Sequence, residues 1–125
     1  MEETRMSNSD YRFMQIVWQH APVGSGELGM VCAEELGWKK STTYTEIKRL
    51  SEKGFLKNEN AVVEPLISME EAQKRESGAF VERTFSGSLP GFLAAFLGGK
   101  KLSAKEADEL KKLIDSHREQ EGGAE

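Results

Sequence analysis

The segment LGWKKSTTYTEIKRLSEKGFLK, residues 36–57, decides the fold that this sequence predicts. Thr43, Ile47 and Leu50 recur at helical spacing, so residues 41–53 are expected to form a helix that packs these side chains inward and ends at the following glycine. Most of its other positions are hydroxyl-bearing, aromatic or basic. A helix with this division of faces is suited to entering a DNA major groove.

The same segment is basic within an acidic chain. The sequence of 125 residues has a net charge of −4, which argues against a protein that coats nucleic acid indiscriminately. Residues 39–57 nevertheless hold six basic side chains against two acidic ones, Glu46 and Glu52. A local basic surface suits contact with phosphates at one place on the molecule.

Two helices are expected upstream of this segment. The first runs from a cap at residues 7–8 to about His20, where Ala21-Pro22 stops it. The second opens at residues 25–26 and ends at Gly37, a natural C-terminal cap. Apolar residues recur at helical spacing in both, so each is expected to pack one face into a core.

A hairpin is expected downstream. Residues 55–56 read as extended, residues 58–60 as a polar turn and residues 62–67 as a second extended run. Three short helices followed by a hairpin outline a winged helix that contains a helix-turn-helix.

The C-terminal half predicts three more helices. Capping-box patterns at residues 68–71 and 103–106 open the first and third, while Ser88 with Pro90 opens the second, which stops at glycines 98–99. We therefore expect a mainly α fold with a small β-hairpin, divided into a winged-helix DNA-binding domain (1–67), a helical dimerisation region (68–120) and a disordered tail (121–125).

The predicted DNA contacts lie on the exposed side of the helix at residues 41–53 and on the hairpin. The amides of the helix N-terminus also attract anions. Glu46 opposes DNA binding unless it pairs with Arg49 or accepts from a cytosine amino group. The alternative is a solvated helix face. The residues expected to contact DNA are Lys39, Lys40, Ser41, Thr42, Tyr44, Thr45, Lys48, Arg49, Lys53, Lys57 and Asn58.

The C-terminal helices carry more apolar side chains than a layer of three helices can bury against itself. A second copy of the chain is the simplest cover for them, so the sequence predicts a homodimer. The residues assigned to this interface are Phe80, Val81, Phe85, Leu89, Phe92, Leu93, Phe96, Leu110 and Ile114.

Several other classes of protein are not expected. No apolar run approaches the ~20 residues that span a bilayer, and the N-terminus lacks signal-peptide features, so we expect a cytoplasmic protein without membrane insertion. Cys32, the single cysteine, reads as a small buried hydrophobe. His20 and His117 lie far apart, without a nucleophile, a phosphate loop or paired metal ligands. The sequence predicts no enzyme, no cofactor and no metal site.

Residues 9–117 resemble the penicillinase-repressor family of BlaI, MecI and CopY proteins. The resemblance rests on YRFMQIVW (11–18), LGWKKSTTYT (36–45), KRLSEKGF (48–55), FSGSL (85–89) and LSAKE (102–106). It implies a winged helix that reads a palindromic operator and a helical part that makes a homodimer. Thr42, Arg49 and the Lys53-Gly54 end match the family's recognition helix.

The resemblance also implies a mode of induction, in which a membrane-bound sensor metalloprotease leads to cleavage of the repressor. The corresponding bond lies here at Ala95-Phe96, where members with a dedicated protease often have Asn before the Phe. Lys39-Lys40-Ser41 replaces the family's usual Ser-Pro-Lys, so an operator sequence does not carry over. The Cys-rich metal site that ends the copper-responsive members is absent from this sequence.

The remaining alternative is a winged helix that serves as a protein-interaction adaptor and does not bind DNA. The overall acidity favours it mildly, while the basic Lys48-Arg49 pair opposes it. A mobility-shift experiment with DNA separates the two readings.

Overall fold

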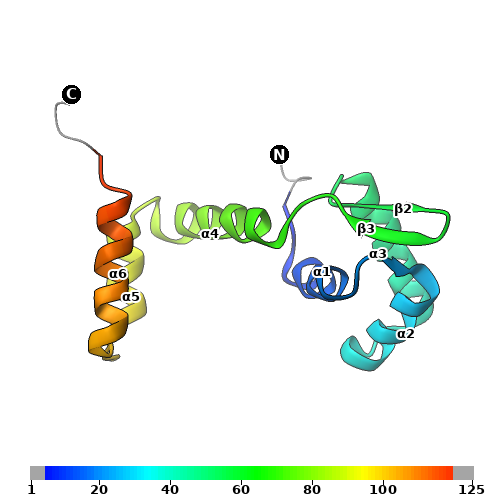
Figure 1. Ribbon diagram of the computed structural model, residues 1–125, viewed down its shortest axis with the longest axis horizontal. Coiled ribbons are helices and arrows are strands. Elements are labelled where there is room, and N and C mark those ends of the chain that lie inside the picture. The colour runs from blue at the N-terminus through cyan, green and yellow to red at the C-terminus, as the bar shows by residue number, and fades with distance from the viewer. Residues whose placement is uncertain (1–4, 120–125) are drawn as a thin grey trace.

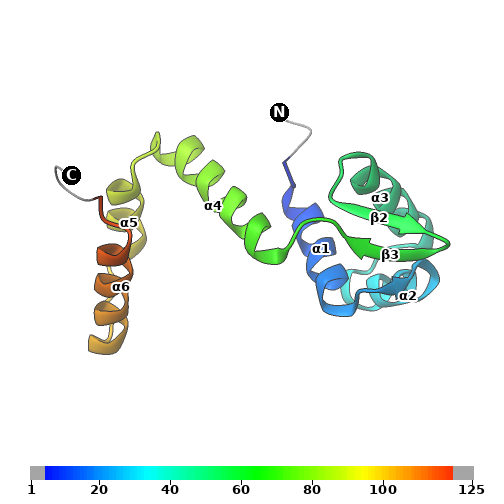
Figure 2. The ribbon, with the colours of Figure 1, turned by 45° about the horizontal axis from the view of Figure 1, so that its top comes forward.

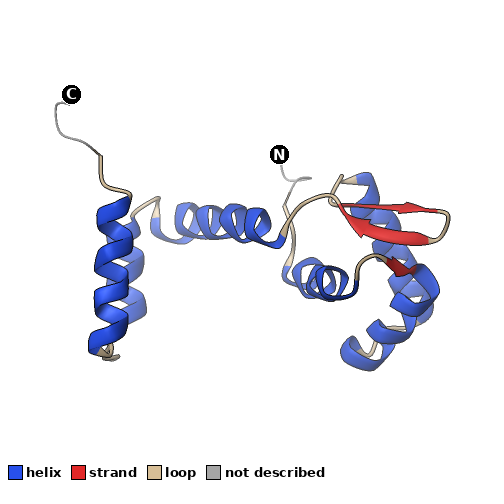
Figure 3. Ribbon diagram, viewed as in Figure 1, coloured by secondary structure: helices blue, strands red, loops and turns tan. Residues whose placement is uncertain are grey.

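The computed structural model describes residues 5–119 and has a mainly helical architecture with one small sheet (Figures 1 and 3). The expected fold class is confirmed, and the expected tail at 121–125 lies outside the described residues. The elements in chain order are α1 (Asn8–His20), β1 (Val23–Gly24), α2 (Ser25–Leu36), α3 (Lys40–Glu52), β2 (Leu56–Glu59), β3 (Val62–Pro65), α4 (Met69–Phe85), α5 (Leu89–Leu97) and α6 (Ala104–Ser116).

The first two helices begin and end where local chemistry predicts. At the start of α1, the Ser7 hydroxyl accepts from the Asp10 amide at 3.0 Å and the Asp10 carboxylate accepts from the Ser7 amide at 2.9 Å. At the end of α2, Gly37 adopts a left-handed conformation with φ of 70° and donates its N–H to the carbonyl of Ala33. The chain is thereby turned toward α3.

The third helix is displaced slightly from its expected bounds. It begins at Lys40 and ends at Glu52, one residue earlier at each end than the sequence suggested. Lys53 is its C-terminal cap, and the expected stop follows immediately at Gly54, which has φ of 87°. Thr43, Ile47 and Leu50 are buried, as their spacing predicts.

The sheet is larger than the expected hairpin. Its strands lie in the order β1-β3-β2 and all pairs are antiparallel. Strand β1 was not predicted, because a run of two residues shows no periodicity of its own. The expected turn at residues 58–60 is wrong in position, since Asn58 pairs with Val63 in the ladder. Asn60 and Ala61, with φ of 54° and 62°, make the turn instead.

One apolar core joins α1, α2, α3 and the sheet. Phe13, Met14, Leu28, Leu50 and Leu56 are its largest fully buried apolar side chains. The core also includes Ile67 and Ala72, and the Trp18 indole donates to the Ile67 carbonyl at 2.9 Å. The start of α4 is therefore fastened to the N-terminal half.

The C-terminal helices are arranged differently. In both views α4 leads away from the N-terminal half, and α5 and α6 lie side by side at its far end (Figures 1 and 2). Neither α5 nor α6 contains a buried residue. Within residues 5–119 no helix has the length and apolar character that crossing a bilayer requires.

The expected capping boxes of α4 and α6 are only half formed. Ser68 and Ser103 accept from the amides of Glu71 and Glu106, each at 3.0 Å. The Glu71 carboxylate, expected to reach back to Ser68, accepts instead from Arg75 Nε at 3.3 Å. Glutamate and arginine four residues apart lie on one helix face, so this pair competes with the cap.

Candidate nucleic-acid interface

The outward face of α3 brings together most of the side chains that the sequence assigned to DNA contact. Thr43, Glu46, Ile47 and Leu50 face the interior. On α3 and its N-cap, the exposed residues among those assigned to DNA contact are Lys39, Lys40, Ser41, Thr42, Tyr44, Thr45 and Lys48, and the acid Glu52 is exposed at the end of the helix. We call these seven residues, without Glu52, the α3 surface. It presents three hydroxyls of serine and threonine, one phenol and three ammonium groups, which can donate to phosphate oxygens and to base edges.

The N-terminal end of α3 is open to an anion. Lys39 is its N-cap and provides no side-chain hydrogen bond to the first turn. The first turn therefore presents backbone amides together with the positive end of the helix dipole. The Lys40 ammonium lies 5.9 Å from the centre of the Tyr44 ring, which keeps a cation beside this end.

The wing offers a weaker case for phosphate contact. Asn58 is exposed on β2, next to the half-buried Lys57. The Lys57 ammonium lies 3.7 Å from the carboxylate of Glu59, and Glu64 is exposed on β3. The single lysine of the wing, at residues 56–65, therefore lies among two acidic side chains that repel phosphate.

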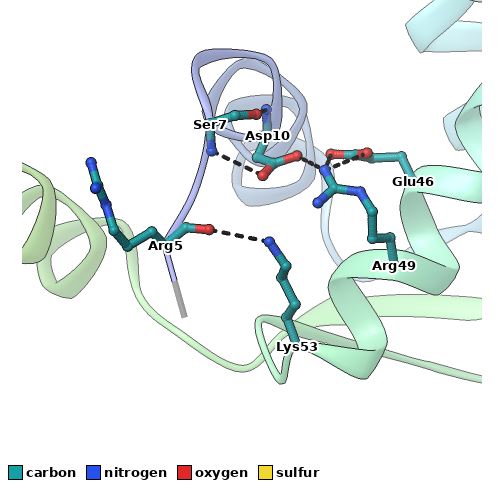
Figure 4. Close-up of polar contacts among 6 residues, drawn as sticks. All are labelled: Arg5, Ser7, Asp10, Glu46, Arg49 and Lys53. Carbon is teal, nitrogen blue, oxygen red and sulfur yellow. Dashed lines mark hydrogen bonds and ion pairs between the residues drawn. The ribbon is translucent and has the colours of Figure 1, made fainter. Parts of the chain in front are cut away.

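Arg49 is oriented away from the α3 surface. Its Nη2 contacts the Asp10 carboxylate on α1 and lies 3.0 and 3.2 Å from the two oxygens of Glu46 (Figure 4). Asp10 is 1% exposed, whereas the Arg49 side chain is 41% exposed. The pairing of Glu46 with Arg49, one of the two ways in which the sequence analysis allowed a glutamate on this helix, is therefore present.

Burial governs the protonation of this cluster. Burial, with the hydrogen bond and the charge of Asp10, raises the pKa of Glu46 to about 7 against the opposing effect of Arg49. Burial also disfavours ionised Asp10, but hydrogen bonds to Glu46 and Ser7 and the Arg49 charge outweigh it, so the pKa of Asp10 is lowered. Glu46 is therefore the carboxyl that titrates near neutrality while Asp10 stays ionised.

Lys53 lies at the other end of α3, away from its open N-terminus. Its ammonium donates to the Arg5 carbonyl at 3.4 Å (Figure 4). Asp10, which links α1 to α3, was not predicted as a site residue. The available signal was its place three residues after Ser7, which marks a helix cap and says nothing about a second partner.

The residues assigned to dimerisation gather at the far end of α4. Phe80, Phe85, Phe92 and Phe96 form a chain of ring contacts with centroids 5.6 to 6.0 Å apart. Leu89, Phe96 and Ile114 are more than half exposed, as is Leu113. Val81, Leu93 and Leu110 are half-buried. The described chain leaves this apolar surface largely uncovered.

Cys32 is buried, as predicted, and burial raises the pKa of its thiol. A neutral thiol in an apolar setting is a poor nucleophile. Among the described residues, no group of three or more His, Cys, Asp and Glu side chains is placed to hold a metal ion.

Comparison with known proteins agrees with this architecture. Residues 6–116 match the family described as penicillinase repressor. A penicillinase repressor of Bacillus licheniformis is 25% identical over 118 residues, which cover 91% of this chain and 92% of the relative. The methicillin resistance regulatory protein MecI of Staphylococcus aureus is 23% identical over 114 residues, covering 88% and 93%. The match includes all the elements from α1 to α6, and the chain belongs to the penicillinase repressor family.

Proposed function

We propose that this chain is a transcriptional repressor that binds a palindromic operator as a homodimer and acts in the cytoplasm. The observation that carries the proposal is the α3 surface, where hydroxyl and ammonium groups stand exposed on one helix. Membership of the penicillinase repressor family supports it, and relatives bear names of regulatory proteins.

The α3 surface divides by chemistry into two sets of contacts. Ser41, Thr42 and Thr45 have short side chains that reach base edges only when the helix enters the groove. The lysines are longer and strongly hydrated, so we assign them to phosphates, where they fix the helix without reading sequence. Lys57 and Asn58 on the wing supply further backbone contacts in this proposal.

Dimerisation is proposed for α4, α5 and α6. The supporting observation is the lack of any buried residue in α5 and α6, although these helices carry exposed leucine, isoleucine and phenylalanine. Apolar area is worth about 25 cal/mol per Å² when it is removed from water, so a second copy gains by covering it. A two-fold dimer would place its α3 helices about one DNA turn, or a multiple of it, apart.

Relief of repression by cleavage between Ala95 and Phe96 is part of the proposal, with a membrane-bound sensor metalloprotease as the partner. Both residues are exposed, yet the bond lies inside α5. A protease needs an extended substrate, so α5 has to unwind locally before the bond is cut. A short helix with little buried surface opens at low cost.

The experiment that tests the function is selection of duplexes from a random pool by the full chain, followed by titration with the winning sequence and by sedimentation of free protein. We expect enrichment of an inverted repeat and a dimeric mass at micromolar concentration. A monomeric mass would contradict the dimer, and a pool that never enriches would contradict the DNA-binding function.

One observation favours the second candidate, a winged-helix adaptor for another protein. Glu59 and Glu64 on the wing oppose a phosphate contact there. The same selection distinguishes the candidates, because an adaptor enriches no duplex.

A further inference from the structure

We propose that Arg49 acts in operator binding as a positioning residue, forming with Asp10 and Glu46 a clamp that holds the DNA-reading helix α3 against α1. The inference rests on the proposed function, because it concerns how α3 is presented to DNA. Figure 4 shows the two carboxylates meeting one guanidinium nitrogen from opposite sides.

The clamp is anchored in the backbone of α1. One oxygen of Asp10 accepts from the Ser7 amide at 2.9 Å, while the other contacts Arg49. Asp10 therefore closes the first turn of α1 and binds α3 with the same carboxylate. Its side chain is fixed by the cap, so α3 is held to a rigid point and not to a mobile side chain.

The burial of the acids argues against a direct DNA contact by Nη2 of Arg49. Asp10 is 1% exposed and the Glu46 side chain 10% exposed, so neither carboxylate is free to follow the guanidinium to a phosphate. Moving Arg49 to DNA would leave two buried acids without their cation, and an unpaired buried charge is strongly destabilising.

Directional contacts matter here because the core to which α1 and α3 both contribute side chains is apolar. Apolar packing is non-directional and tolerates small rotations of a helix. Recognition of base edges requires side chains held within about 0.5 Å and 10–20° of the productive geometry. The clamp supplies a directional restraint in the middle of α3.

The clamp also responds to protonation. Glu46 interacts with Asp10 on α1 and with Arg49 on its own helix. Its charge, together with that of Glu35, also acts on the buried thiol of Cys32 on α2. With a proton on Glu46, one carboxylate meets one guanidinium. When that proton leaves, two buried negative charges face a single cation, so the packing of α3 on α1 weakens as the pH rises.

The test uses the full chain and a duplex selected from a random pool by the wild-type protein. Asp10→Asn keeps an oxygen for the Ser7 amide but loses the charge that holds Arg49. Arg49→Met removes the guanidinium, and Glu46→Gln imitates the protonated acid. Lys48→Met, on the exposed side of the same helix, is the matched control. Circular dichroism fixes a temperature at which every variant is folded.

We expect Asp10→Asn and Arg49→Met each to weaken binding about tenfold, the scale of one recognition contact, without changing the salt dependence. The double variant should be no weaker than either single one. Lys48→Met should lower the salt slope by about one. Wild-type affinity should fall between pH 6 and 8, and Glu46→Gln should remove that fall.

Two results would contradict the clamp while leaving the proposed function intact. The first is unchanged or tighter binding by Asp10→Asn, as expected if Arg49 reads DNA once it is released. The second is a salt slope lowered by Arg49→Met as much as by Lys48→Met. If the wild-type chain enriches no duplex at all, the proposed function fails and the role of the clamp in it fails too.

Discussion

Glu46 makes the stability of the winged helix depend on pH. Its folded pKa of about 7 lies above the usual 4.5, so its contribution is complete below pH 4.5 and is lost as the pH rises through 7. At 1.36 kcal/mol per pKa unit, the loss has an upper limit of about 3 kcal/mol. We expect the free energy of unfolding, measured by urea titration, to fall from pH 5 to pH 8.

Glu46→Gln supplies the control for this expectation. A neutral amide keeps the shape of the protonated acid and has no proton to lose, so its unfolding free energy should be flat across the same interval. Equal slopes for the variant and the wild type would mean that another group titrates there. The lowered pKa of Asp10 acts in the opposite direction, since its contribution is lost only as the pH falls through that value.

Lys48 allows a charge on the exposed face of α3 to be examined by itself. It is exposed one turn from the exposed Thr45 and Tyr44, so we place its ammonium at a phosphate. Lys48→Ala should reduce the slope of log affinity against log salt by about one, with equal effect on specific and non-specific duplexes. Lys74→Ala, an exposed lysine on α4, should leave the slope unchanged. If Lys74→Ala lowered the salt slope and Lys48→Ala did not, the phosphate contact would lie on α4 and not on α3.

At the scale of the element, the turn between α2 and α3 depends on Gly37. Its φ of 70° lies in the left-handed region that side chains disfavour, although the space around it is open. Gly37→Ala should therefore cost about 1 kcal/mol of unfolding free energy, through backbone conformation alone. Gly26→Ala is the matched control, because that glycine lies inside α2 with equally open surroundings and alanine favours a helix. It should be neutral or stabilising in the same thermal scan. A Gly37 variant as stable as the wild type would contradict this account of the turn.

The elements also show what a sequence can predict. Ser7, Gly37 and Ser88 mark helix ends through bonds with their immediate neighbours, so those boundaries were predicted within a residue or two. Strand β1 was missed because its pairing partner, β3, lies about forty residues away and two residues show no alternation. Arg49 follows the same rule. Its position on a helix was predicted, but the orientation of its side chain depends on a contact with Asp10, 39 residues upstream, and was not predicted.

At the scale of the whole molecule, α4 joins two parts that differ in how far they bury their apolar side chains. The N-terminal end has a closed core, whereas the C-terminal end exposes Leu89, Phe96 and Ile114 at more than half of their surface. Helix α4 separates α3 from the apolar helices α5 and α6 (Figure 1). If the chain dimerises through α5 and α6 as proposed, a change in these helices can alter DNA binding by changing assembly, without altering α3.

Truncation after Ala95 tests that arrangement. The shortened chain keeps α1 to α4 and most of α5, but it loses Phe96 and all of α6 with Leu110, Leu113 and Ile114. The winged helix should stay folded, since its core draws on no residue beyond Ala72. Two heads joined in one dimer act at a high effective concentration on a palindrome, an advantage that can reach 10²–10⁴.

We therefore expect the truncated chain to sediment as a monomer, to bind one half-site as weakly as the full chain does, and to bind the full palindrome little better than the half-site. Truncation after Ser116 leaves α6 in place and serves as the control, which should match the full chain. If the shorter protein still dimerised and held the palindrome as tightly as the full chain, cutting at Ala95-Phe96 would not release the operator. A ligand or partner acting on the C-terminal helices would then have to end repression.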